Sequence, residues 1–332
     1  MGLVATIEAS RRRLVMPIGV YAGLALTGGN VRDAVSNAEA QAAAVLALRD
    51  RLGTPFLVSA MDLSAEAEAF GCEVRLTDGE VPAVLGRLVT DASGAERLAV
   101  PEVGETRTRV HLAAGAALAR TSGAEPVLGC MIGPFSLAGR LFGMAEALEA
   151  TVAEPEIVLT LLEKVTPFLC AYARAFREVG AAGVVMAEPA AGLLSPRGLG
   201  RFSTTFVRRI VDEVQNEGFA LVLHNCGARS VHLPRVLEAG AAMYHFGAPM
   251  DMAAAAMAAA EMSGRPVVSG NVDPTFIHDA TAEAVETEGR RILESVGSSA
   301  RFVLASGCDL PPGTPLEHIA ALFRAAEGAT VR

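Results

Sequence analysis

The chain has 332 residues, of which 51% are hydrophobic and only 5% aromatic. Its 37 acidic and 28 basic residues give a formal net charge of −9, which argues against a polyanionic partner such as nucleic acid. No apolar run reaches the roughly 18 residues that a membrane span needs, and the N-terminus lacks a signal-peptide pattern. Because so few of the hydrophobic residues are aromatic, we expect an aliphatic core. The five cysteines form no closely spaced disulfide framework, so we expect a cytoplasmic protein.

Short apolar runs alternate with longer amphipathic stretches along the chain, an order typical of parallel β/α units. Most of the runs are continuously apolar, as strands covered on both faces are. In chain order the eight predicted strands are 14–21, 56–59, 127–133, 183–187, 220–224, 242–246, 266–270 and 301–306. We therefore predict an α/β fold, a single (β/α)₈ TIM barrel over residues 1–332. The stretch around 77–122 predicts an insertion with a hairpin and helices.

Polar side chains gather where these predicted strands end. In a barrel the carboxyl ends of the strands form the catalytic face. The strands were chosen from apolar runs alone, so this convergence independently supports the barrel. The residues are Asp62, Glu188, His224, Cys226, His245, Asn271, Asp273 and Cys308.

One imidazole and two thiols form the most informative part of this set. His224 and Cys226 would point to the same side of an extended strand, and Cys308 follows a strand that opens onto the same face. Taken singly, each thiol is explained as a small buried hydrophobe and the histidine as a hydrogen-bonded core residue. Together, with both thiols beside glycine, they predict tetrahedral zinc with an open fourth position, where a thiol or water becomes a nucleophile.

The remaining polar residues allow two explanations each. Asp62 and Glu188 are either carboxylates in the barrel mouth or, respectively, a helix cap and a loop charge. Asn271 and Asp273 suit either a polar clamp on a substrate or turn chemistry. We take Asp62, Glu188 and His245 as candidate catalytic residues, and Asn271 and Asp273 as candidate substrate-binding residues.

Motifs along nearly the whole chain resemble a known family. They are Met61-Asp62, 66–71, 133–138, Ser195-Pro196, 224–227, 270–274, 306–308 and 314–317. They look like the uroporphyrinogen decarboxylase superfamily and, within it, the zinc-dependent cobamide methyltransferases. The resemblance implies a (β/α)₈ barrel, Zn²⁺ on His224, Cys226 and Cys308, and methylcobamide carried by a separate corrinoid protein.

The activity implied by the resemblance is transfer of a methyl group from the methylated corrinoid protein to a small-molecule acceptor. A zinc-activated thiol of the coenzyme M type is the most direct acceptor, since zinc removes the thiol proton. Similar enzymes carry an acidic fourth ligand after the sixth strand, where this chain has Gly247 and Ala248. Tetrahydrofolate therefore stays open as the acceptor.

Two further activities stay open. Uroporphyrinogen decarboxylases resemble the chain around Gly133-Pro134, but they carry arginines where this chain has 16–23 and a histidine at the position of Cys308. A non-catalytic barrel that binds a corrinoid or tetrapyrrole is the other alternative. The sequence leaves the oligomeric state open, a homodimer included.

Overall fold

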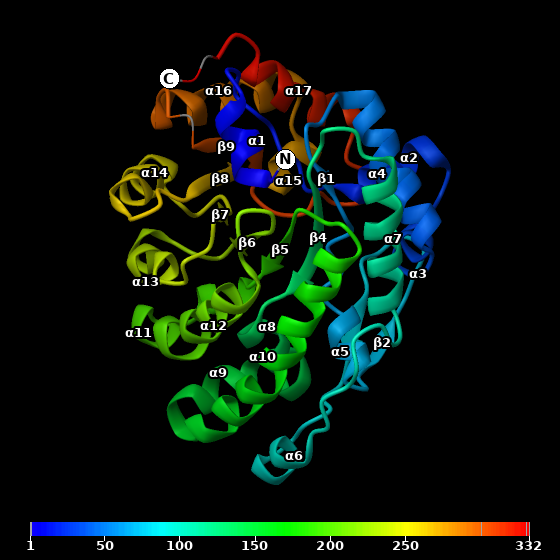
Figure 1. The fold of residues 1–332 in the computed structure, drawn as a ribbon, viewed down its shortest axis with the longest axis vertical. Coiled ribbons are helices and arrows are strands. Elements are labelled where there is room, and N and C mark those ends of the chain that lie inside the picture. Colours follow the sequence, from blue (N-terminus) through cyan, green and yellow to red (C-terminus); the bar gives the residue numbers. More distant parts are fainter. Residues whose placement is uncertain (1, 300, 330, 332) are drawn as a thin grey trace.

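The structure is a computed structural model that describes residues 2–299, 301–329 and 331. Seven parallel strands form one curled sheet in which strand order follows chain order (Figure 1). Their parallel registers bring all seven carboxyl ends to the same end of the sheet. The strands are β1 (Leu57–Val58), β4 (Val127–Ile132), β5 (Gly183–Ala187), β6 (Ala220–Asn225), β7 (Met243–Phe246), β8 (Val267–Val272) and β9 (Phe302–Ser306).

The first predicted strand, 14–21, is irregular in the structure. Val15 forms a single parallel bridge with Leu304, and Met16 donates a backbone hydrogen bond of 2.8 Å to the Leu304 carbonyl. Pro17 has no N–H to continue the ladder, and helix α2 begins at Val20. The predicted α/β barrel fold is confirmed, but the prediction of eight regular strands is wrong because this segment pairs at one point only.

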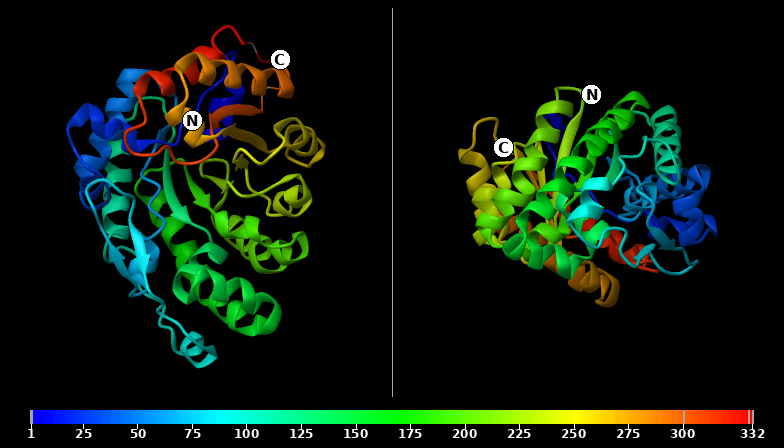
Figure 2. Two further views of the ribbon diagram at one scale, coloured as in Figure 1. Left: turned by 180° about the vertical axis from the view of Figure 1, so that it is seen from behind. Right: turned by 90° about the horizontal axis from the view of Figure 1, so that it is seen from below.

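Helices surround the sheet on its outer side (Figures 1 and 2). The helices of the N-terminal part are α1 (Leu3–Ala9), α2 (Val20–Thr27), α3 (Val31–Ser36), α4 (Ala38–Leu52), α5 (Ala65–Ala69), α6 (Ala92–Arg97) and α7 (Thr108–Thr121). Those of the C-terminal part are α8 (Pro134–Phe142), α9 (Met144–Ala153), α10 (Pro155–Glu178), α11 (Pro196–Leu199), α12 (Thr205–Val214), α13 (Leu233–Leu237), α14 (Met252–Glu261), α15 (Pro274–Asp279), α16 (Ala282–Val296) and α17 (Leu316–Ala326). None of the helices that the structure describes is long and apolar enough to cross a membrane.

The segment between β1 and β4 contains the predicted hairpin and helices. Strands β2 (Glu73–Arg75) and β3 (Ala83–Leu85) pair antiparallel, and α6 and α7 follow. Figure 1 shows α6 at the end of an arm, far from both termini. His111 of α7 lies 3.4 Å from the carboxylate of Asp62, which follows β1, so the segment contributes to the carboxyl end of the sheet.

Candidate metal centre and its surroundings

The carboxyl ends of β6 and β9 bring one imidazole and two thiols together. His224 lies in β6, Cys226 follows directly after it, and Cys308 follows β9. One nitrogen or sulfur atom from each residue lies within 4.8 Å of the others, and His224 Nε2 is 3.5 Å from Cys308 Sγ. His224 is buried while both thiols reach partly to the surface.

This donor set fits a zinc ion. Ligand atoms around a tetrahedral zinc lie about 3.5 Å apart, given metal–ligand distances of about 2.0–2.3 Å. The hydrogen bond between the thiols lowers the pKa of Cys226, although burial opposes this effect. The same hydrogen bond, together with burial, raises the pKa of Cys308 to about 12. A divalent cation that coordinates the two sulfurs would displace their thiol protons.

His245 stands directly behind the imidazole of His224. The two residues are partners in the parallel register of β6 and β7, and their Nδ1 atoms are 2.7 Å apart. Burial, and then the charge of His224, holds the pKa of His245 well below its usual range. When His224 Nε2 serves as a metal ligand, its Nδ1 carries a proton and donates it to His245. His245 is thus placed to fix the tautomer of His224.

The chain after β7 comes too close to Cys226 to carry a ligand side chain at position 247. A Cβ atom on Gly247 would lie 2.3 Å from the Cys226 carbonyl oxygen, far inside van der Waals contact. A Cβ on Gly307 would lie 3.0 Å from the backbone nitrogen of Ala248. Close backbone packing around the two thiols therefore explains why small residues occupy these positions.

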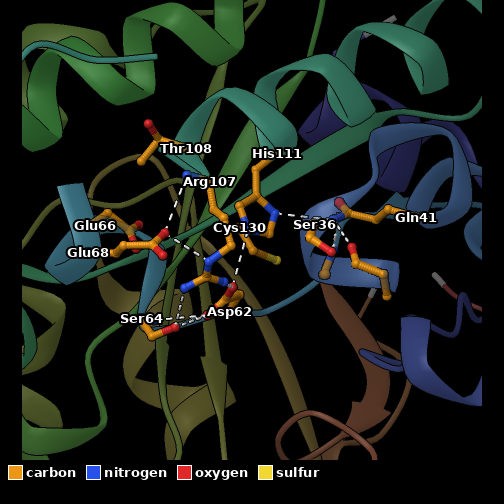
Figure 3. A network of polar contacts seen from close by, with 12 residues as sticks. Ser36, Gln41, Asp62, Ser64, Glu66, Glu68, Arg107, Thr108, His111 and Cys130 are labelled. Carbon is orange, nitrogen blue, oxygen red and sulfur yellow. Dashed lines mark hydrogen bonds and ion pairs between the residues drawn. The ribbon is translucent and has the colours of Figure 1, made fainter. Parts of the chain in front are cut away.

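Asp62 lies on another side of the barrel mouth, inside a polar network that Figure 3 shows. We define the Asp62 network as Gln41, Asp62, Ser64, Glu68, Arg107 and His111. Arg107 pairs with Asp62 and, at 2.8 Å, with Glu68. The Ser64 hydroxyl donates to Asp62 at 2.6 Å, and His111 Nε2 lies 3.4 Å from the same carboxylate. The Asp62 side chain has no exposed surface.

The electrostatics of the network fix Asp62 as a carboxylate. Burial alone would raise the pKa of Asp62, but the hydrogen bond from His111 and the charge of Arg107 outweigh it and lower the pKa to about 2. Arg107, Ser64 and His111 thus surround the Asp62 carboxylate within the protein. The sequence analysis did not predict Arg107 or His111, which lie in the insertion and carry no local motif.

Glu188 follows β5 and anchors the start of α8. Its carboxylate accepts hydrogen bonds of 2.8 Å from the backbone N–H groups of Phe135 and Ser136, and one of 2.9 Å from Ser203. Its own N–H donates to the carbonyl of His224 at 2.8 Å. Burial raises its pKa. Glu188 therefore ties α8 to β6, the strand that carries His224.

Asn271 and Asp273 both bond to the protein backbone. The Asn271 amide donates to the carbonyls of Gly247 and Met250 at 2.9 and 2.8 Å, which fixes the loop after β7. Asp273 accepts from the N–H of Thr275 at 2.8 Å and caps α15. The structure brings His224, Cys226, Cys308 and His245 together. It places Asp62, Glu188, Asn271 and Asp273 in contacts with other protein groups.

Comparison with known proteins assigns the fold to a family. The sequence profile described as "Uroporphyrinogen decarboxylase (URO-D)" matches residues 13–329, nearly the entire chain. The chain belongs to the uroporphyrinogen decarboxylase family. The predicted resemblance is confirmed, and the barrel mouth described above is the mouth of a uroporphyrinogen decarboxylase-like barrel.

Relatives within this family have two kinds of activity. The methylcobamide:CoM methyltransferase MtbA of Methanosarcina acetivorans is 30% identical over 271 residues, which cover 80% of this chain and 77% of that protein. The uroporphyrinogen decarboxylase of a Xanthomonas oryzae pv. oryzae strain is 29% identical over 287 residues, or 82% and 79% of the two chains. Both relatives are enzymes, so the prediction of an enzyme is confirmed.

A solved structure of a methyltransferase from Methanosarcina mazei has the same fold. It superposes with a TM-score of 0.86 over 98% of this chain and 97% of that chain, at 24% sequence identity. The two chains therefore share one fold over nearly the whole of their lengths.

Proposed function

We propose that this chain is a zinc-dependent methyltransferase that moves a methyl group from a methylated corrinoid protein to a thiol acceptor. The observation that carries the proposal is the set of one nitrogen and two sulfur donors, all within 4.8 Å, at the ends of β6 and β9. Identities of 30% and 29% to a methyltransferase and a decarboxylase do not separate the two activities. The donor set supports the methyltransferase, because a soft N/S site suits zinc.

His224, Cys226 and Cys308 would hold the zinc ion. When bound, zinc lowers the pKa of a coordinated thiol, so that a thiolate is present at neutral pH. In the transfer, the acceptor sulfur forms a bond to the methyl carbon, and the electron pair of the cobalt–carbon bond stays with cobalt. The thiol proton leaves to solvent.

The chain's own residues would orient this chemistry. His245 fixes the tautomer of His224, since its neutral imidazole accepts the Nδ1 proton at 2.7 Å. Glu188 holds α8 against the strand that carries His224. Asp62 acts through the network that closes one side of the mouth, in which it is already paired with Arg107. In this proposal Asn271 and Asp273 shape the loop after β7 and the start of α15.

The test mixes zinc-loaded protein with methylcobalamin and one acceptor at a time. We expect cob(I)alamin and a methyl thioether with 2-mercaptoethanesulfonate, and neither product from the metal-free protein. The acceptors to compare are homocysteine and tetrahydrofolate. Cob(I)alamin formed with tetrahydrofolate alone would contradict the thiol acceptor. Release of CO₂ from uroporphyrinogen without methyl transfer would favour the decarboxylase, and tight corrinoid binding without turnover would favour a non-catalytic barrel.

A further inference from the structure

A cavity of about 670 Å³ lies beside the loop that follows β7. Residues of α14, α15, α16 and the carboxyl end of β8 line it together with that loop. Gly247, where the loop begins, packs against the backbone of Cys226, whereas Ala248 and Met250 of the same loop line the cavity. The volume falls within the range of about 300–1,000 Å³ that is usual for small-molecule sites, so a small organic molecule fits.

Part of the lining is apolar. Met250, Met252 and Ile292 line the cavity although their side chains are almost completely buried in the protein. Phe276 of α15 lines it as well, but this ring is 40% exposed. An apolar floor with a partly exposed aromatic ring offers contact to the hydrocarbon part of a ligand.

The amide of Asn271 adds a polar group that is almost buried, with 6% of the residue exposed. Its nitrogen donates to the carbonyl oxygens of Gly247 and Met250 at 2.9 and 2.8 Å. Because both of these neighbours are acceptors, the nitrogen must face them, and the orientation of the amide is fixed. Within residues 2–299, 301–329 and 331, no group donates a hydrogen bond to the remaining amide oxygen. That oxygen can accept a hydrogen bond from a bound molecule.

Two carboxylates give the cavity negative charge. Asp251 caps α14 and Asp273 caps α15, each through its Oδ1 atom, which accepts a backbone N–H at 3.1 and 2.8 Å respectively. No hydrogen bond to either Oδ2 atom occurs within the described part of the chain. Arg291, which also lines the cavity, is neutralised by Glu288, since two of its nitrogens donate to that carboxylate at 2.8 and 2.7 Å. The cavity therefore presents acceptor oxygens and a net negative charge.

We propose that this cavity binds an organic ammonium ion, a primary or secondary amine with an apolar body. Its N–H groups would donate to the Asn271 amide oxygen and to the carboxylates of Asp251 and Asp273, while its hydrocarbon part lies against Phe276. An anionic ligand would be repelled by the same two carboxylates. The inference goes beyond the proposed methyl transfer and does not rest on it, because the residues that carry it are separate from the zinc ligands.

The experiment measures the binding of three probes to the full chain by ligand-observed NMR titration. Benzylamine, benzyl alcohol and benzoate share one ring and differ in charge at pH 7. We expect benzylamine to bind at least about tenfold more tightly than benzyl alcohol, the sum of two exposed ion pairs, and benzoate to bind more weakly than either. Salt should weaken the binding of benzylamine and leave that of benzyl alcohol nearly unchanged.

Asparagine variants place the probe in this cavity. Asp251→Asn and Asp273→Asn remove the charge but keep the helix caps, because asparagine caps a helix as well as aspartate does. Each should raise the Kd of benzylamine about twofold to fivefold, the range of an exposed ion pair, and leave the Kd of benzyl alcohol within about twofold. Asp91→Asn is the matched control, since Asp91 caps α6 in the same way outside the cavity, and it should change neither Kd.

Phe276→Ala should weaken benzylamine and benzyl alcohol alike, about twofold to tenfold, because it removes the contact of the ring with both. Far-ultraviolet circular dichroism shows that each variant is folded. Equal affinity of wild type for benzylamine and benzyl alcohol would overturn the inference, as would an unchanged Kd of benzylamine in the double variant Asp251→Asn/Asp273→Asn. Loss of methyl transfer activity in any assay leaves these binding results unaffected, so the two proposals fail separately.

Discussion

Polar groups on two sides of the barrel mouth differ in how deeply they are buried and in how many protein partners they have. At the ends of β6 and β9, the thiols of Cys226 and Cys308 are half-buried and have mainly each other and His224 as partners. At the end of β1, Asp62 is fully buried and is bonded by Ser64 and Arg107. The nitrogen and sulfur atoms at the ends of β6 and β9 can still bind a ligand. The Asp62 carboxylate is already bonded to protein groups.

The difference indicates that some polar residues at strand ends are available to bind a ligand, whereas others hold the fold together. A buried charge is tolerated where its partners are built in, and removal of one of those partners is then strongly destabilising. Donors that face each other without full compensation attract a metal or substrate instead. The following predictions test this division, from the largest expected effect to the smallest.

Cys308→Ser should abolish the metal centre. Loss of one of three ligands should lower zinc occupancy to near zero and the rate of methyl transfer by at least about a hundredfold. Atomic emission on the purified protein and the methylcobalamin assay measure both effects. Cys72→Ser, at a buried cysteine outside the site, is the control and should keep its zinc. Full zinc occupancy in Cys308→Ser would contradict the assigned ligand set.

Arg107→Ala should destabilise the fold. It leaves the Asp62 carboxylate buried without its main counter-ion, so the free energy of unfolding should fall by roughly 3–5 kcal/mol. Urea denaturation measures the change.

The control is Arg235→Ala, which breaks an exposed ion pair of 2.9 Å with Glu238 and should cost less than about 1 kcal/mol. Similar losses of unfolding free energy in the two variants would show that the Asp62 network stabilises the fold no more than an exposed ion pair does.

His245→Phe should weaken zinc binding while leaving the ligands in place. Without the acceptor behind His224 Nδ1, zinc affinity should drop about tenfold to a hundredfold. Competition with a chelator measures the affinity. His245→Gln offers a carbonyl oxygen to the same Nδ1 and should recover part of it. If both variants bind zinc as wild type does, the imidazole pair has no role in positioning the ligand.

Asp62→Asn should change how stability depends on pH. The folded pKa of Asp62 is about 2 and lies below its unfolded value, so its contribution is present above about pH 4 and lost as the pH falls toward 2. That contribution is roughly 2 kcal/mol. Urea unfolding between pH 5 and 2 should show wild type losing about this much more stability than the variant. Parallel pH curves would contradict a depressed pKa at Asp62.

Much of the barrel was predictable from the sequence because its strands are buried on both faces. The predicted runs at 127–133 and 183–187 match β4 and β5 to within one residue. The run at 14–21 failed as a strand because apolar character does not reveal that Pro17 interrupts the ladder. Local signals also explain Asp273, which caps α15 as an Asp-Pro sequence favours.

The site was predictable only where its residues lie at strand ends. The sequence singled out Asp62 but not Arg107, because the partner of a buried charge is chosen by tertiary packing 45 residues away. It singled out His245 but not its place beside His224, which depends on the register between β6 and β7. The chemical identity of a residue was visible in the sequence, while its partner became visible only in the structure.

X-ray absorption at the zinc edge tests the central claim most directly. The account predicts one zinc per chain with one imidazole and two sulfur ligands in the resting protein. Addition of 2-mercaptoethanesulfonate should bring a third sulfur into the coordination shell at about 2.3 Å. A zinc ion without sulfur ligands, or a coordination shell that does not change when the thiol is added, would contradict it.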